Sequence, residues 1–433
     1  MSSQFDRRTF LTGAVGLGLV GRPFRVATAS TAADRLEAFS DWLGASRETR
    51  AARLPECVDR IRVMDASIQA WVQVAPQAAT GDGPLSGIPF GVKDIIETKG
   101  LATEYGSPIY KGRIGETDAA IVRELRGRGG VLLGKTHTTS FAYRTPAPTH
   151  NPRDLAHTPG GSSSGSAAAV AAGMVPLALG TQTGGSVLRP ASFCGVAGFK
   201  TTYGLLPMDG VLPFARSLDT LGFFTQSAAD MLAFWTAFGR GGGSSEQFPL
   251  AAPDPVPDVE PAMRDAFTAA LGNLRKRGVT IRTVDIAGML AKLAAAQRIV
   301  MFYEGARFHE QRYREYGDRL ADMAALVREG LRMTVEQYDD ARRFIADCRA
   351  RVAEWHKATP VILVPAATGP APLGLSNTGD SRMNAPWTAL GTPAISIPMP
   401  VSGLPLGLQL TASHGEDARL LHAAVRIEKL LAA

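Results

Sequence analysis

The sequence predicts an α/β fold in which a central β-sheet is covered by helices on both faces. Short apolar segments typical of buried strands alternate with helical segments along the chain, and this alternation favours a sheet between two helical layers. The 433 residues are 45% hydrophobic and 20% charged. This composition is ordinary for a soluble globular protein, and the length allows a large core.

The first 29 residues differ in character from the rest of the chain. They carry four arginines against one aspartate, and the pair Arg7 and Arg8 precedes a short, glycine-rich apolar stretch and an Ala-x-Ala site that ends at Ala29. This order is typical of a twin-arginine export signal. We therefore expect residues 1–29 to be a signal peptide and the mature protein to be periplasmic or secreted. The alternative is a disordered N-terminus that happens to hold two arginines.

Charge and cysteine content exclude several kinds of site. The formal net charge of +6 falls to about +3 without the first 29 residues, which is too small to indicate nucleic-acid binding. The three cysteines, Cys57, Cys194 and Cys348, lack the spacing of metal ligands. We expect them to be unpaired, with Cys194 a small core residue. We expect neither a metal nor another cofactor.

Two kinds of apolar pattern define the elements of the first half of the chain. Apolar residues three and four positions apart, as at Leu36, Phe39 and Leu43, predict helices, whereas continuous apolar runs predict buried strands. The predicted elements are helices over 34–75, a strand over 87–93, a helix over 118–128, a strand over 131–134, a glycine-serine loop and helix over 160–173, and a strand over 175–179.

The second half begins with a change of composition. Residues 240–258 are rich in Gly, Ser and Pro, which predicts a surface connection. Residues 259–357 are strongly helical in pattern. The elements predicted after them are strands over 361–365, 394–398 and 406–411 and an amphipathic helix over 417–431. We expect a single domain over 30–433 with a helical insertion at about 259–357.

Two glycine-serine turns stand out because apolar segments flank them. One covers Gly160–Ser166 and the other is Gly184-Gly185-Ser186. A flexible linker is the usual meaning of such runs, but apolar flanks place these turns inside a core. A glycine in a core allows another group to approach the backbone closely, or allows the backbone to adopt a positive φ angle. Phosphate binding is the other common use, but the lysine pattern of a phosphate-binding loop is absent.

A serine in such a turn becomes a nucleophile only when a base takes its proton. None of the seven histidines lies in a recognisable catalytic motif. Lysine can serve when it is neutral, and burial lowers its pKa. Lys93 ends the apolar stretch 88–92, which suits a buried amine. Considered alone, Lys93 is better interpreted as a surface lysine at a strand end.

Several separate motifs, in order, resemble the amidase-signature hydrolases. The resemblance runs from about residue 87 to 225 and resumes from 361 to 421. It implies a central mixed β-sheet covered by helices on both faces. The matching motifs are Gly87–Asp94, Gly134–Thr136 with Phe141-Ala142, Pro159–Ser163, Gly180–Ser186 with Pro190 and Cys194–Lys200, Gly391–Pro398, and Gly403–Gln409.

The resemblance implies a Ser–cis-Ser–Lys triad. By position Ser186 is the nucleophile, Ser162 the bridging serine after a cis peptide, and Lys93 the base. Ser162 and Ser186 lie 24 positions apart, which is the family's spacing. Ser163 is implied to be a supporting residue. That Ser163 is instead the bridge remains the alternative at this stage.

The resemblance also implies an oxyanion hole. Its donors are the backbone N–H groups of Thr183, Gly184, Gly185 and Ser186, which we expect at the beginning of a helix, where N–H groups lack partners. The sequence departs from many members at three positions, with Ser164, Gln182 and Arg189. Gln182 and Arg189 occur together in one branch of the family, so we interpret Gln182 as supporting rather than inactivating.

The expected function is therefore hydrolysis of a carboxamide C–N bond through an acyl-enzyme on Ser186. One alternative is the glutaminase subunit of a tRNA-dependent amidotransferase, which an export signal contradicts. The other is a non-catalytic binding protein on the same scaffold. The expected partner is a small-molecule amide, without nucleic acid or metal, and a homodimer is compatible with the sequence.

Specificity is the property that the sequence indicates least. Candidate pocket residues follow the first strands and lie in the helical insertion, and ordinary core packing explains each one as well. On one helix face, Glu304 and Arg307 are spaced to pair with each other. The candidate pocket residues are Thr136, His137, Phe141, Tyr143, Met301, Phe302 and Tyr303.

Overall fold

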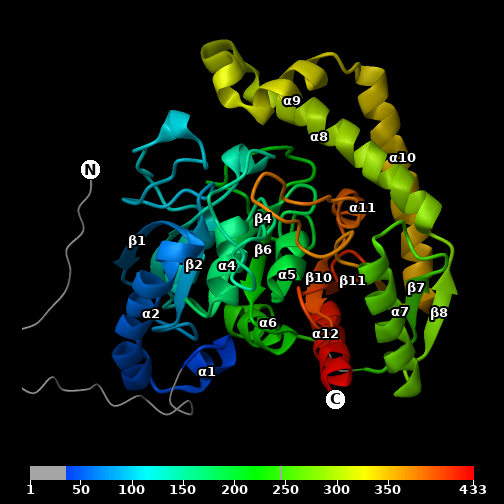
Figure 1. Ribbon diagram of the computed structural model, residues 1–433, viewed down its shortest axis with the longest axis horizontal. Helices are drawn as coiled ribbons and strands as arrows, with labels where there is room; N and C mark the ends of the chain where they lie inside the picture. Colours follow the sequence, from blue (N-terminus) through cyan, green and yellow to red (C-terminus); the bar gives the residue numbers. More distant parts are fainter. Residues whose placement is uncertain (1–35, 244–245) are drawn as a thin grey trace, which may run out of the picture. The chain divides into compact units, whose positions relative to one another are not determined.

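A computed structural model describes residues 36–243 and 246–433 of the chain. The predicted export signal at 1–29 lies outside the described residues. Leu36–Ala433 form one unit, and its helices and strands are shown in Figure 1. No helix within the described ranges is both long and apolar enough to cross a membrane.

The unit is organised around one mixed sheet of eleven strands in the order β1-β3-β2-β4-β6-β5-β10-β11-β9-β7-β8. Strand β2 pairs in parallel with β3 and β4, whereas β4, β6, β5, β10, β11 and β9 pair in antiparallel succession. The strands are β1 (Trp71–Gln77), β2 (Pro89–Lys93), β3 (Val131–Thr136), β4 (Leu177–Gln182), β5 (Ala197–Lys200), β6 (Thr220–Thr225), β7 (Leu250–Pro253), β8 (Ile281–Val284), β9 (Val361–Pro365), β10 (Ala394–Pro398) and β11 (Gly407–Ala412).

Helices cover both faces of this sheet, as predicted. Neighbouring residues of a strand point to opposite faces, and β5 shows both layers. A Cβ added at Gly198 would lie 2.4 Å from Ala191 in α5, whereas the Phe199 ring packs 5.3 Å from that of Trp235 in α6. The helices are α1 (Phe39–Gly44), α2 (Arg47–Ile68), α3 (Ala120–Gly127), α4 (Ser164–Ala171), α5 (Leu188–Cys194), α6 (Ala228–Trp235), α7 (Pro261–Lys276), α8 (Ala287–Tyr316), α9 (Asp322–Leu331), α10 (Val335–Ala358), α11 (Ala385–Leu390) and α12 (Asp417–Ala432).

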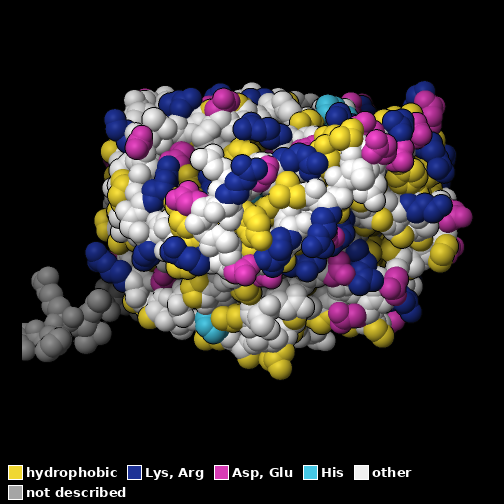
Figure 2. Space-filling view, turned by 90° about the horizontal axis from the view of Figure 1, so that it is seen from above, with side chains coloured by type: hydrophobic (Ala, Val, Ile, Leu, Met, Phe, Trp, Pro, Cys, Tyr) yellow, Lys and Arg dark blue, Asp and Glu magenta, His cyan; other side chains and the backbone are white. Residues whose placement is uncertain are grey.

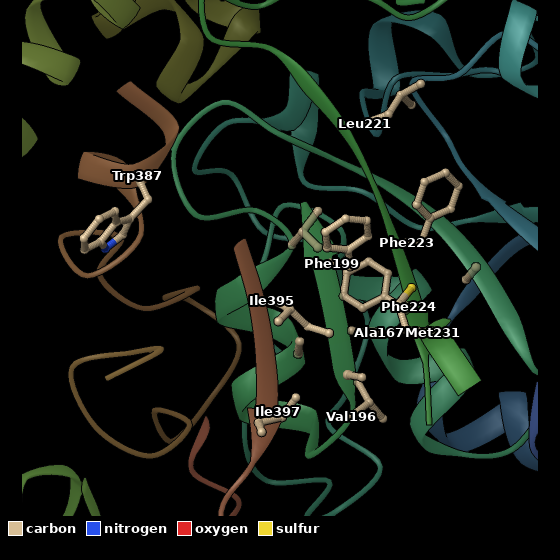
Figure 3. Packing of buried hydrophobic residues seen from close by; sticks show 14 of the residues in the cluster. Ala167, Val196, Phe199, Leu221, Phe223, Phe224, Met231, Trp387, Ile395 and Ile397 are labelled. Atoms are coloured by element: carbon tan, nitrogen blue, oxygen red, sulfur yellow. The ribbon is translucent and has the colours of Figure 1, made fainter. Parts of the chain in front are cut away.

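The centre of the core is aromatic and lies between β6 and α6. Phe223 of β6 contacts Phe234 of α6, with ring centroids 4.8 Å apart, and Phe238 lies beyond them. Figure 3 shows Phe199 and Phe223 together with Ile395 and Ile397 of β10 among the buried side chains of neighbouring strands. This packing makes the middle of the sheet the rigid base from which the site residues project.

The helical segment after β8 lies outside the sheet. Figure 1 shows α8, α9 and α10 side by side, and α8 also packs against α11. The apolar face of α8 includes Leu293, Ala296 and Val300, all buried. Helix α8 therefore joins the helical segment to the part of the sheet that carries α11.

Two sequence predictions were wrong about strands. Residues 34–75 do not stay helical: α2 ends at Ile68, Gln69 takes left-handed angles (φ 54°, ψ 49°), and Trp71–Gln77 forms edge strand β1. The segment 240–258 is more than a surface connection, because Leu250–Pro253 is the buried strand β7 between β8 and β9. Pairing with distant strands stabilises these segments, and local apolar patterns do not report it.

Three further strands lie where none was predicted. Strand β8 lies inside the segment predicted to be helical, and β5 and β6 were not assigned. The remaining predicted elements are confirmed within a few residues of their expected ends. The α/β fold with a mixed central sheet is thus as the sequence predicts, although the sheet is larger.

Candidate active site

One cavity of about 560 Å³ brings together residues from both glycine-serine turns. It is lined by Ser162 and the turn 183–186, and also by residues 142–144, α8 and the loop 376–382. Figure 2 shows Lys and Arg side chains on the face seen from above, interspersed with Asp and Glu, and Arg144, Arg298 and Arg382 line the cavity itself. The structure therefore gathers the predicted serines at a hollow that a small molecule can enter.

Lys93 is completely buried at the end of β2. Its Nζ donates to Ser162 Oγ at 2.7 Å and to Thr181 Oγ1 at 2.9 Å. Burial holds the pKa of Lys93 well below its ordinary value, and the carboxylate of Asp219 partly opposes this shift. A buried amine with hydroxyl partners is suited to exchange a proton with one of them.

Ser162 follows a cis peptide bond, Gly161–Ser162, as the resemblance implies. The carbonyl of Gly161 accepts a hydrogen bond from Arg189 Nη2 at 2.7 Å, and Arg189 Nε donates to Thr378 O at 2.7 Å. Arg189 is buried, and the burial lowers its pKa to about 10. Arg189 thus connects the start of α5 to the first serine turn and to the loop that covers the cavity.

Ser163 connects the two turns without contacting the lysine. Its N–H donates to Ser186 O at 3.3 Å, and its Oγ donates to Thr181 O at 3.3 Å. Among the described residues, Lys93 forms a hydrogen bond with Ser162 and none with Ser163. The geometry therefore favours Ser162 over Ser163 as the partner of the amine.

Ser186 lies half-buried in the wall of the same cavity. Within 36–243 and 246–433, its hydroxyl forms no hydrogen bond, so the contact between Ser186 Oγ and Ser162 Oγ is not made. The N–H groups of Thr183, Gly184, Gly185 and Ser186 also have no acceptor in those ranges. They lie in the turn before α5, which begins at Leu188, rather than in the helix itself.

Gln182 supports this turn from the end of β4. Its Oε1 accepts from Val187 N at 2.9 Å and from Leu188 N at 3.1 Å, and its Nε2 donates to Thr388 Oγ1 at 3.0 Å. One amide therefore satisfies the first N–H groups of α5 and reaches α11. Gln182 therefore holds the second serine turn in place between β4 and α11.

The model of the Amidase family matches residues 52–240 and 247–421, which is most of the chain. The chain belongs to the amidase family.

Two curated relatives show how far the similarity of this amidase-family chain extends. A glutamyl-tRNA(Gln) amidotransferase subunit from Salinispora arenicola is 38% identical over 254 residues, which cover 54% of this chain and 51% of that protein. The corresponding protein from Thermus thermophilus is 31% identical over 408 residues, covering 81% and 86%. The chain thus spans about half the length of the first relative and most of the second.

Solved structures of the amidase family have the same fold. A solved structure described as "Crystal structure of amidase" superposes on this chain with a TM-score of 0.79 at 28% identity. The match covers 89% of this chain and 96% of that one. A glutamyl-tRNA(Gln) amidotransferase subunit from Thermotoga maritima gives a TM-score of 0.77 at 28% identity, covering 91% and 94%.

Several residues of this amidase site were not predicted. Asp219 is buried, accepts from Thr183 Oγ1 at 2.5 Å and from Phe214 N at 2.8 Å, and its pKa is raised to about 6 by burial. Thr181, Gln297 and Thr388 also contact Lys93 or the turn. Thr181 stands in the motif Gly180–Ser186 but was given no role. Asp219, Gln297 and Thr388 lie outside the glycine-serine motifs, on separate segments that only folding brings together.

The predicted pocket residues divide into two groups. Tyr143 and Met301 line the cavity, and the ring of Phe302 lies behind Tyr143 at 6.1 Å. The other candidates belong to the packing around the site: Thr136 Oγ1 bonds Ser166 Oγ, Phe141 packs against His309, and Tyr303 stacks on Tyr338. His137 is half-buried, and desolvation lowers its pKa to about 4.

The predicted pair of Glu304 and Arg307 is not formed. Glu304 accepts from Ser217 Oγ at 2.5 Å and from Tyr338 Oη at 2.8 Å, whereas Arg307 lies over the ring of Tyr303. The prediction was wrong because partners from α10 and from the loop before β6 are closer than the helical neighbour. Glu304 instead holds the loop that ends at Asp219.

Gly185 and Gly184 differ in what surrounds them, and this difference is testable. A Cβ at position 185 would lie 2.5 Å from Asn384 Oδ1, whereas the nearest atom to one at 184 is Ser381 Oγ at 3.6 Å. We expect Gly185→Ala to lower the free energy of unfolding by about 1–3 kcal/mol and Gly184→Ala to leave it nearly unchanged. Urea denaturation followed by circular dichroism measures the free energy of unfolding of both variants. Equal stability of the two variants would contradict the conclusion that Gly185 is crowded and Gly184 is not.

Proposed function

We propose that this protein is an amidase that hydrolyses a linear carboxamide through an acyl-enzyme on Ser186. The observation that carries the proposal is the buried hydrogen bond from Lys93 to Ser162, formed in the same cavity as Ser186 and its turn. A lysine kept neutral by burial can act as a base where no histidine is present. The membership of the amidase family supports the same activity.

Acylation begins when neutral Lys93 accepts the proton of Ser162, which in turn accepts the proton of Ser186. Ser186 Oγ then attacks the carbonyl carbon, and the carbonyl oxygen becomes the oxyanion. The step requires a hydrogen bond between the two serine hydroxyls, and catalytic hydrogen bonds of this kind tighten when substrate binds. The N–H groups of the turn 183–186 are the available donors for the oxyanion, each worth about 3 kcal/mol in the transition state.

The reverse relay completes acylation. The protonated lysine returns its proton through Ser162 to the leaving nitrogen, the C–N bond breaks, and the amine or ammonia leaves the acyl-enzyme. In deacylation, water adds to the ester carbonyl while the relay takes its proton. The C–O bond to Ser186 then breaks, the relay returns the proton to Ser186 Oγ, and a carboxylic acid leaves the regenerated enzyme. Ser162 serves as the bridge because it contacts Lys93 directly, whereas Ser163 binds backbone groups of the neighbouring strand and turn.

Part of the cavity lining is apolar. Tyr143, Phe214 and Met301 line the cavity together with the polar loop 376–382 and the charged side chains of Arg144, Arg298 and Asp322. A volume of about 560 Å³ holds a small molecule rather than a folded polypeptide. We therefore infer that the substrate is a small carboxamide whose acyl part packs against these aromatic and thioether side chains.

A second candidate is the glutaminase subunit of a tRNA-dependent amidotransferase. The names of the curated relatives favour it, since each relative is a subunit of a glutamyl-tRNA(Gln) amidotransferase. In that role the partners would be other protein subunits. The export signal proposed at 1–29 contradicts it, because charged tRNA is made in the cytosol.

Ammonia release from a panel of amides tests the reaction. The panel holds aliphatic and aromatic carboxamides and glutamine, and we expect turnover of the first two classes to exceed that of glutamine. Ser186→Ala should lower kcat by at least about 10⁴-fold, because it removes the hydroxyl on which the proposed acyl-enzyme forms. Ser163→Ala is the matched control and should lose much less.

Activity that survives in Ser186→Ala would overturn the mechanism. Turnover of glutamine alone would favour the amidotransferase role, and no turnover of any amide would favour a binding protein.

The pH profile tests the role of Lys93. The base is active when deprotonated, so kcat/KM should rise with pH and reach its plateau below the free-lysine pKa of about 10.4, because burial lowers the pKa of Lys93. Asp219→Asn should move the midpoint to lower pH, since the Asp219 carboxylate raises the pKa of that lysine. If Asp219→Asn leaves the midpoint of the kcat/KM profile in place, Lys93 is not the group that titrates. An acidic pH optimum would likewise contradict the role of Lys93 as the base.

We also propose that residues 1–29 direct export through the twin-arginine route, as their composition indicates. Replacing both Arg7 and Arg8 by lysine should abolish delivery to the periplasm, measured by fractionation of cells that express the full chain. The same variant should accumulate in the cytoplasm as folded protein. Unchanged delivery would show that the arginine pair has no such role.

A further inference from the structure

We propose that Gln297 of α8 and Thr388 of α11 are positioning residues that aim the oxyanion donors of the turn 183–186. The inference rests on the amidase function proposed above and assigns a physical task to two residues outside the triad. Each of them holds one backbone carbonyl of the turn. In a trans peptide the C=O and the following N–H point in opposite directions, so holding one of these groups fixes the direction of the other.

Gln297 holds the first peptide group. It is buried, and its Nε2 donates to Thr183 O at 2.7 Å. The N–H of Gly184 belongs to the same peptide plane and therefore points away from Gln297. The side chain of Thr183 is held separately by Asp219, whose carboxylate accepts from Thr183 Oγ1 at 2.5 Å. Thr183 is thus fixed at both its carbonyl and its hydroxyl.

Thr388 holds the second peptide group. Its Oγ1 donates to Gly184 O at 2.7 Å and accepts from Gln182 Nε2 at 3.0 Å. A hydroxyl has a single proton, and the amide N–H of Gln182 occupies an acceptor position of Thr388. The proton is therefore directed to Gly184 O rather than to Asn384 O, which lies farther away at 3.4 Å. This arrangement fixes the N–H of Gly185.

The third peptide group is held by the backbone of α5, since Arg189 N donates to Gly185 O at 3.1 Å. Three successive carbonyls are thus bound by three different elements, α8, α11 and α5. The N–H groups of Gly184, Gly185 and Ser186, which belong to these three planes, have no acceptor in the part of the chain that the structure describes. Fixed donors of this kind stabilise a transition state without reorganisation during the reaction.

Helix α8 also forms part of the cavity wall, in addition to holding the turn through Gln297. Ala294, Arg298 and Met301 line the cavity on either side of Gln297 in the sequence. If an acyl group that fits this wall badly shifts α8, it also shifts the Gln297 amide that holds Thr183 O. We therefore expect acyl groups of different shape to change kcat more than KM, and Gln297→Met to reduce this selectivity.

Substitutions of similar size at the two positions test the proposal. Thr388→Val keeps the shape and removes the hydroxyl, Thr388→Ser restores it, and Gln297→Met removes the amide. We expect Thr388→Val and Gln297→Met to lower kcat about tenfold or more, less than the roughly 10²–10³-fold loss of a donor itself. KM should change by less than about twofold, and Thr388→Ser should recover most of the activity.

Thr392→Val is the matched control. Thr392 is also buried and follows α11, but its hydroxyl contacts Trp387 O and Thr411 rather than the turn. The control should keep the kcat of the wild type and show how much loss comes from removing a buried threonine hydroxyl near α11. A kcat loss in Thr392→Val as large as that in Thr388→Val would overturn the positioning role.

Inhibitor binding separates positioning from a general structural effect. An aldehyde analogue of the best substrate adds to Ser186 Oγ: the O–C bond forms, the carbonyl electron pair moves to oxygen, and the serine proton passes through Ser162 to Lys93. Its Ki should rise in Thr388→Val by the same factor by which kcat/KM falls. Binding of the parent amide, measured in a Ser186→Ala background, should stay within about twofold.

The outcomes distinguish this inference from the function on which it rests. Activity in Ser186→Ala would overturn the amidase mechanism and the positioning role with it. An inactive Ser186→Ala together with wild-type kcat in both Thr388→Val and Gln297→Met would overturn the positioning role alone. If Thr388→Val weakens aldehyde binding and amide binding by the same factor, the positioning role is also overturned. If Thr388→Val does not fold, the same comparison of kcat, aldehyde binding and amide binding is made with Gln297→Met on α8.

Discussion

The burial of the Lys93 amine is the constraint on which the rest of the site depends. A charged lysine in this position would have to leave water without a carboxylate in contact, so the amine is stable there mainly as a neutral group with hydroxyl partners. The end of β2, in the middle of a sheet covered on both faces, provides that environment. The proposed proton relay thus depends on where the sheet places one side chain.

The same central strands determine where the serines lie. Strand β4 pairs with β2 and ends at Gln182, so the second serine turn begins beside the end of the lysine strand. Ser163 and Arg189 then join the two turns, through Ser186 O and Gly161 O. Because the backbone N–H of Ser163 and the side chain of Arg189 join the two turns, neither turn can move far without disturbing the lysine contact.

The outer parts of the protein contribute through contacts between residues that lie far apart in the chain. Gln297 lies on a helix of the insertion and Asp219 precedes β6, yet both contact Thr183. Strands β1 and β7 were missed for a related reason, since each is stabilised by pairing with a distant strand. In all these cases the partner lies many residues away, and local composition carries no signal of it.

The sequence by itself determined the α/β class and the motifs that contain Lys93, Ser162, Ser186 and the turn 183–186, because glycine-serine turns with apolar flanks and an apolar strand ending in lysine are local patterns. Only the tertiary structure decided that Ser162 rather than Ser163 contacts the amine and that Gln182 reaches Thr388. It also decided that Glu304 holds the loop before β6 instead of Arg307. Hydrogen bonds act over about 3 Å, so their partners follow from packing and not from position in the chain.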